Sequence, residues 1–175
     1  MNLEIEILKY ISGLHMPLLD KIMIFITSLG NSGLVFIAIG IILMLRKKSR
    51  REGINILLAL GICFIFGNVI MKPLIARARP FTISEVELLI KAPTDFSFPS
   101  GHTYSAFAAA MSSYFYNKKR SIALFIFAIV MGFSRLYLYV HYPTDVFVGA
   151  LFGIGCAILA KYILDTFTKK TGIAI

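Results

Sequence analysis

Long uncharged apolar stretches dominate the chain. Residues 22–45 contain no charged side chain, and residues 53–71 contain none either. A helix needs about 20 such residues to cross the hydrocarbon core of a bilayer. The apolar residues form continuous runs rather than the one-sided stripe that marks a helix of a soluble protein. The pattern therefore predicts an all-α fold, a polytopic bundle of transmembrane helices.

Five stretches are expected to span the membrane, and a further segment is expected to lie along its surface. Residues 3–14 mix Glu4, Glu6 and Lys9 with leucine, isoleucine and tyrosine, which is typical of a helix at the interface. The spans are expected at about 19–45, 53–72, 101–117, 121–138 and 143–164.

Two polar segments interrupt this pattern. "GNSG" at 30–33 is expected to break the first span, so that residues 19–33 either span or lie in the interface. Residues 76–100 are polar and contain prolines, which predicts a loop, and "ISEVELLI" at 83–90 favours a short surface helix within it. Lys91 and Asp95 are interpreted as solvated residues of that loop.

Composition agrees with a membrane protein of one domain, residues 1–175. Hydrophobic residues make up 58% and charged residues 15%, whereas soluble domains average about 45–50% and about 25%. The net charge of +9 would suit a nucleic-acid partner, but the basic residues argue against one. They cluster at 46–51 and 118–120, in short segments between apolar stretches, as the positive-inside rule describes. We expect no nucleic-acid partner and no obligate protein partner.

The basic clusters also predict the orientation of the chain. If both lie in the cytoplasm, loops 73–100 and 136–143 fall together on the outer side, with the N-terminal segment, and Lys169 and Lys170 end inside. The expectation is a multi-pass plasma-membrane protein whose polar loops face the extracytoplasmic side.

Three segments of the predicted outer side carry charged and catalytic side chains. They are "KPLIARARP" at 72–80, "PSGH" at 99–102 and "SRLYLYVHYPTD" at 134–145. Charged groups at membrane depth cost a few kcal/mol each, so they tend to be functional. Several cations beside two histidines suit a phosphate, whose negative charge is spread over several oxygens.

Local sequence gives each segment a chemical role. Ser100 and Gly101 precede a helix whose first N–H groups can bind an anion, and His102 in its first turn can donate a proton. Pro143 suits the first turn of the last helix, so Asp145 can accept a hydrogen bond from one ring nitrogen of His141. The other nitrogen is then free to act as a nucleophile.

The three segments together resemble the signature of the type 2 phosphatidic acid phosphatase family. The matching elements are Lys72-x6-Arg79-Pro80, Pro99-Ser100-Gly101-His102 and Ser134-Arg135-x5-His141-x3-Asp145. The same superfamily contains vanadium haloperoxidases and bacterial acid phosphatases. The flanking spans are similar to those of the small bacterial membrane members that act on undecaprenyl diphosphate, so the resemblance covers most of the chain.

The resemblance implies a reaction through a phosphohistidine. His141 would attack phosphorus, Asp145 would orient it, and His102 would protonate the leaving oxygen and then activate water. It implies no metal and no other cofactor. The phosphate would be held by Lys72, Arg79, Ser100, Gly101 and Arg135. Ser134 is either a phosphate contact or a packing residue, and the role of Arg77 stays open.

The expected substrate is a lipid phosphate or diphosphate in the membrane, most simply undecaprenyl diphosphate. Phosphatidylglycerophosphate and phosphatidate are rival substrates, and transfer of the phosphoryl group to another lipid is a rival reaction. A haloperoxidase of this superfamily would be soluble and much larger. From a different class, a transporter or scaffold with anion-binding loops remains an alternative. The aromatic residues Tyr137, Tyr139 and Tyr142 are typical of an interfacial belt.

Overall fold

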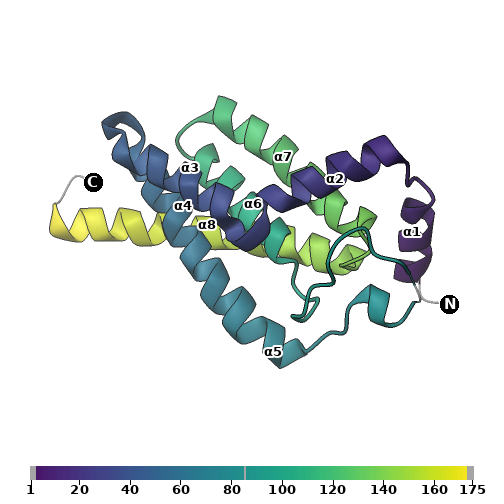
Figure 1. Ribbon diagram of the computed structural model, residues 1–175. Coiled ribbons are helices and arrows are strands. Elements are labelled where there is room, and N and C mark those ends of the chain that lie inside the picture. The colour runs from purple at the N-terminus through teal and green to yellow at the C-terminus, as the bar shows by residue number, and fades with distance from the viewer. Residues whose placement is uncertain (1–2, 85, 173–175) are drawn as a thin grey trace.

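The structure is a computed structural model that describes residues 3–84 and 86–172. Every regular element in these residues is a helix, which confirms the all-α prediction (Figure 1). In chain order the elements are α1 (Leu3–Ser12), α2 (Pro17–Leu29), η1 (Asn31–Gly33), α3 (Leu34–Leu45), η2 (Lys47–Ser49), α4 (Arg50–Cys63), η3 (Phe64–Met71), α5 (Lys72–Ile75), η4 (Pro80–Thr82), α6 (Gly101–Tyr114), α7 (Lys118–Tyr137) and α8 (Pro143–Thr171).

Among residues 3–84 and 86–172, three helical stretches are long and apolar enough to cross a membrane. They are Lys47–Thr82, Lys118–Tyr137 and Pro143–Thr171, and the pair α2 and α3, bent by 45°, makes a fourth if it counts as one span. The third predicted span corresponds to α6, whose 14 residues extend only about 21 Å. A bilayer core is about 30 Å thick. The helix that carries His102 is therefore a short central element rather than a full-length span.

Helix α6 forms the centre of the bundle because its side chains are small. Most of its residues are buried, among them Ala106, Ala108, Ala109 and Ala110. Gly153 of α8 lies directly against its backbone: a Cβ atom there would stand 2.2 Å from the carbonyl oxygen of Tyr104. Small residues let the two helices approach closely, and this close packing fixes the head of α6 beside the start of α8.

The expected break in the first span is present at residues 30–33. Ser32 and Gly33 adopt left-handed conformations, with φ of 53° and 68°, which end α2 and start α3 in a new direction. Gly30 packs against α6 so tightly that a Cβ atom there would be 2.5 Å from Cδ2 of His102. The break therefore places a polar turn against the first turn of α6.

The surface helix expected at 83–90 is absent from the described part of that segment, residues 83–84 and 86–90, so this prediction was wrong. Val86, Leu88 and Ile90 lie at every second position and pack against the buried connection between α7 and α8. An extended chain directs alternate side chains to one side, and packing overrides the local helical pattern. The tyrosines of this connection are also buried, with exposed fractions of 3% or less, so they form no interfacial belt: Tyr137, Tyr139 and Tyr142.

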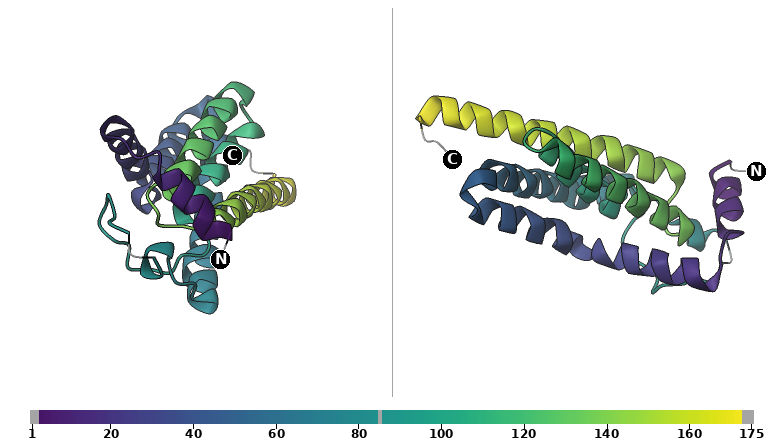
Figure 2. Two further views of the ribbon diagram at one scale, coloured as in Figure 1. Left: turned by 90° about the vertical axis from the view of Figure 1, so that its right-hand side faces the viewer. Right: turned by 90° about the horizontal axis from the view of Figure 1, so that it is seen from above.

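The bundle has one end at the turn from α3 to α4 and the other at α1 (Figure 2). Both predicted basic clusters meet at the end where α3 turns into α4: six basic residues of 46–51 and 118–120 line one cleft there. Arg120 pairs with buried Glu52 in this cleft, and Arg51 pairs with Asp165 of α8. Helix α1, loop 76–100 and the α7–α8 connection lie at the opposite end. This separation agrees with the predicted grouping of the loops.

Candidate functional site

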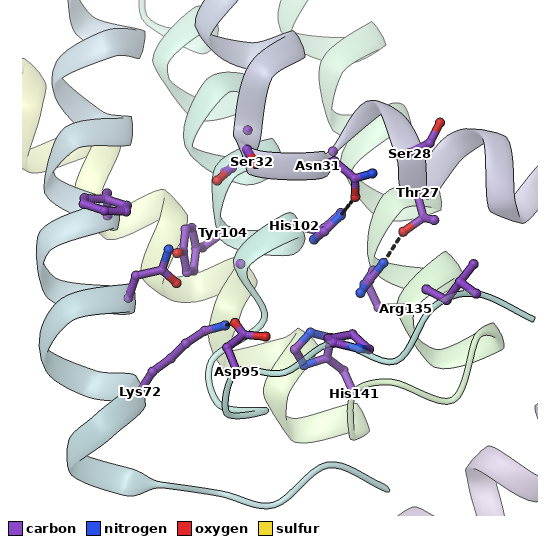
Figure 3. A pocket seen from close by; sticks show the side chains of 18 of the residues that line it. Thr27, Ser28, Asn31, Ser32, Lys72, Asp95, His102, Tyr104, Arg135 and His141 are labelled. Atoms are coloured by element: carbon purple, nitrogen blue, oxygen red, sulfur yellow. Dashed lines mark hydrogen bonds and ion pairs between the residues drawn. The ribbon is translucent and has the colours of Figure 1, made fainter. Parts of the chain in front are cut away.

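A cavity of about 1140 Å³ lies between the bent pair of α2 and α3, the stretch of α4 and η3, the start of α6 and loop residues 90–95. Its wall brings together residues from all three polar segments of the sequence (Figure 3). Six of the eight predicted site residues line it: Lys72, Arg79, Gly101, His102, Arg135 and His141.

Three cations of this cavity are buried. The exposed fractions are 6% for Lys72, 4% for Arg79 and 3% for Arg135. Lys72 follows directly on the π-helical element η3, Arg79 stands in extended backbone before Pro80, and Arg135 belongs to the last turn of α7. Bringing three positive charges together out of water is unfavourable unless an anion compensates them. The arrangement is therefore suited to bind a multiply charged anion.

Asp95 supplies a negative charge at this place. Its carboxylate accepts hydrogen bonds from the Lys72 ammonium and, at 2.7 Å, from the Arg79 guanidinium, whose Nε also donates to the Asp95 carbonyl at 2.8 Å. Partial burial opposes the charged form, but the two cations outweigh it and lower the pKa of Asp95 to about 2. The interpretation of Asp95 as a merely solvated loop residue was wrong. Lys91, which is exposed, also lines the rim of the cavity.

His141 is buried in the connection between α7 and α8, with both ring nitrogens occupied. Nδ1 lies 3.4 Å from Oδ2 of Asp145, and Nε2 lies 3.2 Å from Nη1 of Arg79. Because the guanidinium can only donate, we assign the ring proton to Nδ1 and the lone pair to Nε2. Burial, together with the nearby charges of Arg79 and Arg135, lowers the pKa of His141 to about 3 despite the opposing effect of Asp145. The ring is thus neutral at physiological pH, with Nε2 turned toward the cavity cations.

Asp145 is fully buried behind His141 and does not line the cavity. Its Oδ2 accepts from the backbone N–H of Tyr142 at 2.9 Å and from the Ser97 hydroxyl. Its Oδ1 accepts from Arg77 at 2.6 Å. The carboxylate is thereby fixed in one orientation, as a group that positions a histidine requires.

His102 approaches the cavity from the first turn of α6 (Figure 3). Its Nε2 lies 3.2 Å from Oδ1 of Asn31, which belongs to the turn between α2 and α3. The neighbouring Thr27 hydroxyl accepts a hydrogen bond from Arg135. The broken first span therefore supports both the second histidine and one of the cations.

Ser100 is the predicted phosphate ligand that the structure turns away from the cavity. Its hydroxyl is fully buried and accepts from Thr103 at 2.9 Å, while its N–H donates to the backbone carbonyl of Asp145 at 3.1 Å. A phosphate contact by Ser100 stays a prediction. Ser134 donates to the carbonyl of Met131 and is buried, so of the two roles considered for it the packing role fits.

Four residues that the sequence did not single out for the site contact its members. Thr27 and Asn31 had a weak signal, because they are polar within or beside an apolar stretch. For Asp95 and Ser97 the signal was absent, since their contacts depend on how the loop folds back over the α7–α8 connection. Arg77, whose role the sequence left open, also contacts the site, through Asp145.

The cavity continues from the cations into an apolar part. Leu57, Leu60 and Phe64 line it from α4 and η3, and Ile24 and Ile37 line it from α2 and α3. One wall is therefore the bent helix pair, and another wall is the helical stretch of α4 and η3. A ligand with an anionic head and an apolar chain suits both parts.

Comparison with known proteins gives consistent matches. Residues 52–169 match the sequence profile of the PAP2 superfamily. The undecaprenyl-diphosphatase BcrC of Bacillus subtilis is 37% identical over 81% of this chain and 74% of its own length. The crystal structure of Aquifex aeolicus LpxE superposes with a TM-score of 0.79 at 32% identity, covering 93% of this chain and 96% of that one. A PAP2-type phosphatidylglycerolphosphate phosphatase from Bacillus subtilis superposes with a TM-score of 0.77 at 29% identity, over 93% and 85%.

Proposed function

Because the chain belongs to the PAP2 superfamily and is a membrane phosphatase of that family, we propose that it hydrolyses the terminal phosphate of undecaprenyl diphosphate. The observation that carries this proposal is the pairing of two histidines with three buried cations at one end of an apolar cavity. The cations suit a diphosphate head, and the apolar part suits a polyprenyl chain.

The first step is the attack of His141 Nε2 on the terminal phosphorus. An N–P bond forms as the bond from phosphorus to the bridging oxygen breaks, and His102 donates a proton to that oxygen. Asp145 accepts the Nδ1–H of His141 and stabilises the positive charge that the ring acquires. Lys72, Arg79 and Arg135 stabilise the negative charge on the phosphoryl oxygens in the transition state.

The second step is hydrolysis of the phosphohistidine. His102, now neutral, accepts a proton from water as the water oxygen bonds to phosphorus and the N–P bond breaks. Inorganic phosphate leaves, His141 returns to its neutral form, and His102 is again protonated. The fixed position of His102 beside Asn31 supports its use in both steps.

The proposal includes the face of the membrane. The basic clusters gather at the end of the bundle opposite the cavity, and short basic segments prefer the cytoplasm. The active site then opens on the extracytoplasmic side. Labelling of a single cysteine introduced into loop 86–94 of intact cells tests this orientation. Access only after the cells are permeabilised would contradict it.

A phosphate-release panel with purified protein in detergent tests the reaction and the substrate. It compares undecaprenyl diphosphate, phosphatidylglycerophosphate, phosphatidate and a soluble phosphate ester, with His141→Ala as the control. We expect the highest kcat/KM for undecaprenyl diphosphate and no turnover by the variant. Release by His141→Ala at the wild-type rate would refute the covalent mechanism.

Phosphatidylglycerophosphate is the second candidate substrate, because a solved relative with a TM-score of 0.77 is a phosphatidylglycerolphosphate phosphatase. The same panel separates the two lipids by their kcat/KM. Recovery of a phosphorylated acceptor lipid instead of free phosphate would identify phosphoryl transfer in place of hydrolysis.

A further inference from the structure

We propose that Arg77 and Glu4 are positioning residues that keep the Asp145 carboxylate charged and directed at His141. This inference rests on the proposed role of His141 as nucleophile. It assigns a role to an arginine outside the signature positions and connects the N-terminal helix to the reaction.

The guanidinium of Arg77 makes three hydrogen bonds and stacks on one aromatic ring. Nη1 donates to Oδ1 of Asp145 at 2.6 Å and to the Thr144 hydroxyl at 2.7 Å. Nη2 donates to Oε2 of Glu4 at 2.5 Å, and the guanidinium carbon lies 3.8 Å from the centre of the Tyr142 ring. A planar group with fixed donors and a stacked face is well ordered. Its geometry fits a support, and Arg77 does not line the cavity.

Charge balance explains why such a support is needed. Asp145 is fully buried, and its other partners are the neutral ring of His141, the Ser97 hydroxyl and the Tyr142 N–H. An ionised carboxylate in such surroundings is unfavourable without a cation. Arg77 is the cation that contacts it, whereas Arg79 contacts His141 instead.

Glu4 fixes Arg77 from the opposite side. Its Oε1 accepts from the N–H of Thr144 at 3.1 Å and from the Thr144 hydroxyl at 2.7 Å. Burial opposes the charge of Glu4, but hydrogen bonds from Thr144 and Arg77 outweigh it and lower the pKa of this carboxyl. Glu4 is therefore ionised at neutral pH and joins α1 to the first turn of α8.

Glu4 belongs to α1, a helix that packs on the bundle by one face only. Leu8 and Ile11 of α1 are buried, while Leu3 and Tyr10 are 68% and 79% exposed. An apolar exposed face on a short helix suits the membrane interface. The Asp145 carboxylate is thus joined through Arg77 and Glu4 to a helix that suits the membrane interface.

The test compares Arg77→Gln, Arg77→Lys and Glu4→Gln with wild type and with Arg46→Gln, an exposed arginine at the other end of the bundle. The readouts are kcat, KM and the pH dependence of kcat with undecaprenyl diphosphate. For Arg77→Gln we expect kcat to fall about 10- to 100-fold, because a buried charge loses its partner, while KM changes less than about 3-fold. The lysine variant recovers part of the loss, and Glu4→Gln loses less than Arg77→Gln.

The pH profile distinguishes positioning from a purely structural role. Without Arg77 the carboxylate is more readily protonated, so the acidic limb of kcat moves to higher pH by about one unit, while Arg46→Gln leaves it in place. An unshifted limb in both Arg77 variants would overturn the inference, as would a change in KM alone. Binding of orthovanadate, a phosphate mimic, shows which variants have kept a folded site. If Arg77→Gln does not bind it, the acidic limb of kcat is compared between Glu4→Gln and wild type instead.

Failure of this inference is distinguishable from failure of the proposed function. Rapid quench of wild type with labelled substrate either traps a phosphohistidine or does not, independently of Arg77. A wild-type phosphohistidine that forms at the same rate in Arg77→Gln overturns only the positioning role. Its absence from wild type under turnover would overturn the nucleophile assignment on which both proposals rest.

Discussion

Substitution of Asp95 by asparagine should make the site bind phosphate more tightly. In the structure the Asp95 carboxylate accepts hydrogen bonds from Lys72 and Arg79. We propose that the same two cations bind the substrate phosphate. An incoming phosphate must displace this carboxylate or share its donors. Asparagine keeps the shape of the side chain and removes the competing charge.

The magnitude follows from burial. The Asp95 side chain is 54% exposed, whereas those of Lys72 and Arg79 are 8% and 5% exposed. Exposed ion pairs contribute about 0.2–1 kcal/mol each, and the buried cations place both pairs near the upper value. Loss of about 1–2 kcal/mol of competition corresponds to a Kd for phosphate that is about 5- to 30-fold lower.

Competitive inhibition of lipid hydrolysis by inorganic phosphate or orthovanadate measures this change. Asp165→Asn is a matched control, because Asp165 also pairs with two cations, Arg51 and Lys161, but at the opposite end of the bundle. We expect its inhibition constants to equal those of wild type. An Asp95→Asn enzyme that binds phosphate as weakly as wild type, or more weakly, would show that Asp95 orders the cations instead of competing for them.

The pH dependence of this competition has a definite sign. The pKa of Asp95 is lowered to about 2, so its ion pairs persist above the ordinary carboxyl pKa of about 3.9 and weaken only as the pH falls through about 2. The ratio of inhibition constants between wild type and Asp95→Asn should therefore stay constant from about pH 5 to pH 8.

Three further outcomes follow from the packing and from the proposed chemistry. Gly30→Ala should lower kcat by at least about 10-fold, because its Cβ would displace the histidine of α6, whereas Gly155→Ala, with open space around it and outside the cavity, should be neutral in the same assay. Gly153→Ala should cost about 1–3 kcal/mol and lower the unfolding temperature in detergent as α6 and α8 separate, whereas Gly155→Ala should not. Phosphate release should be unchanged by a metal chelator; activity lost to the chelator and restored by added metal would contradict the proposed chemistry.

The structure brings together around one cavity the cations and histidines that the sequence singled out, and such residues are conspicuous in a membrane protein. Charged groups at the ends of apolar stretches are rare, and Lys72, Arg79 and Arg135 have few structural reasons to be there. His102 and Asp145 lie in the first turns of α6 and α8, and helix starts are set by nearby residues. Gly101 and Pro143 were therefore enough to predict where these two side chains stand in their helices. The helix class and the break at residues 30–33 followed from the same local signals.

The contributions of the loop could not be predicted in this way. Asp95 and Ser97 reach the site because Val86, Leu88 and Ile90 pack as an extended segment against the α7–α8 connection. That packing depends on residues about 50 positions later in the chain, and local propensity favoured a helix instead. Arg77 was ambiguous for a similar reason, since its partner Glu4 lies 73 residues away.

The π-helical element η3 has a consequence for reading related sequences. Its eight residues wind more widely than an α-helix, and Lys72 follows directly after them. Removing one residue between Phe64 and Met71 would leave every signature residue in the sequence but would turn the lysine to another side of the helical stretch, because one residue is roughly a quarter of a helical turn. A chain can therefore carry the complete set of motifs and still lack the site, and the number of apolar residues before the lysine is as informative as the lysine itself.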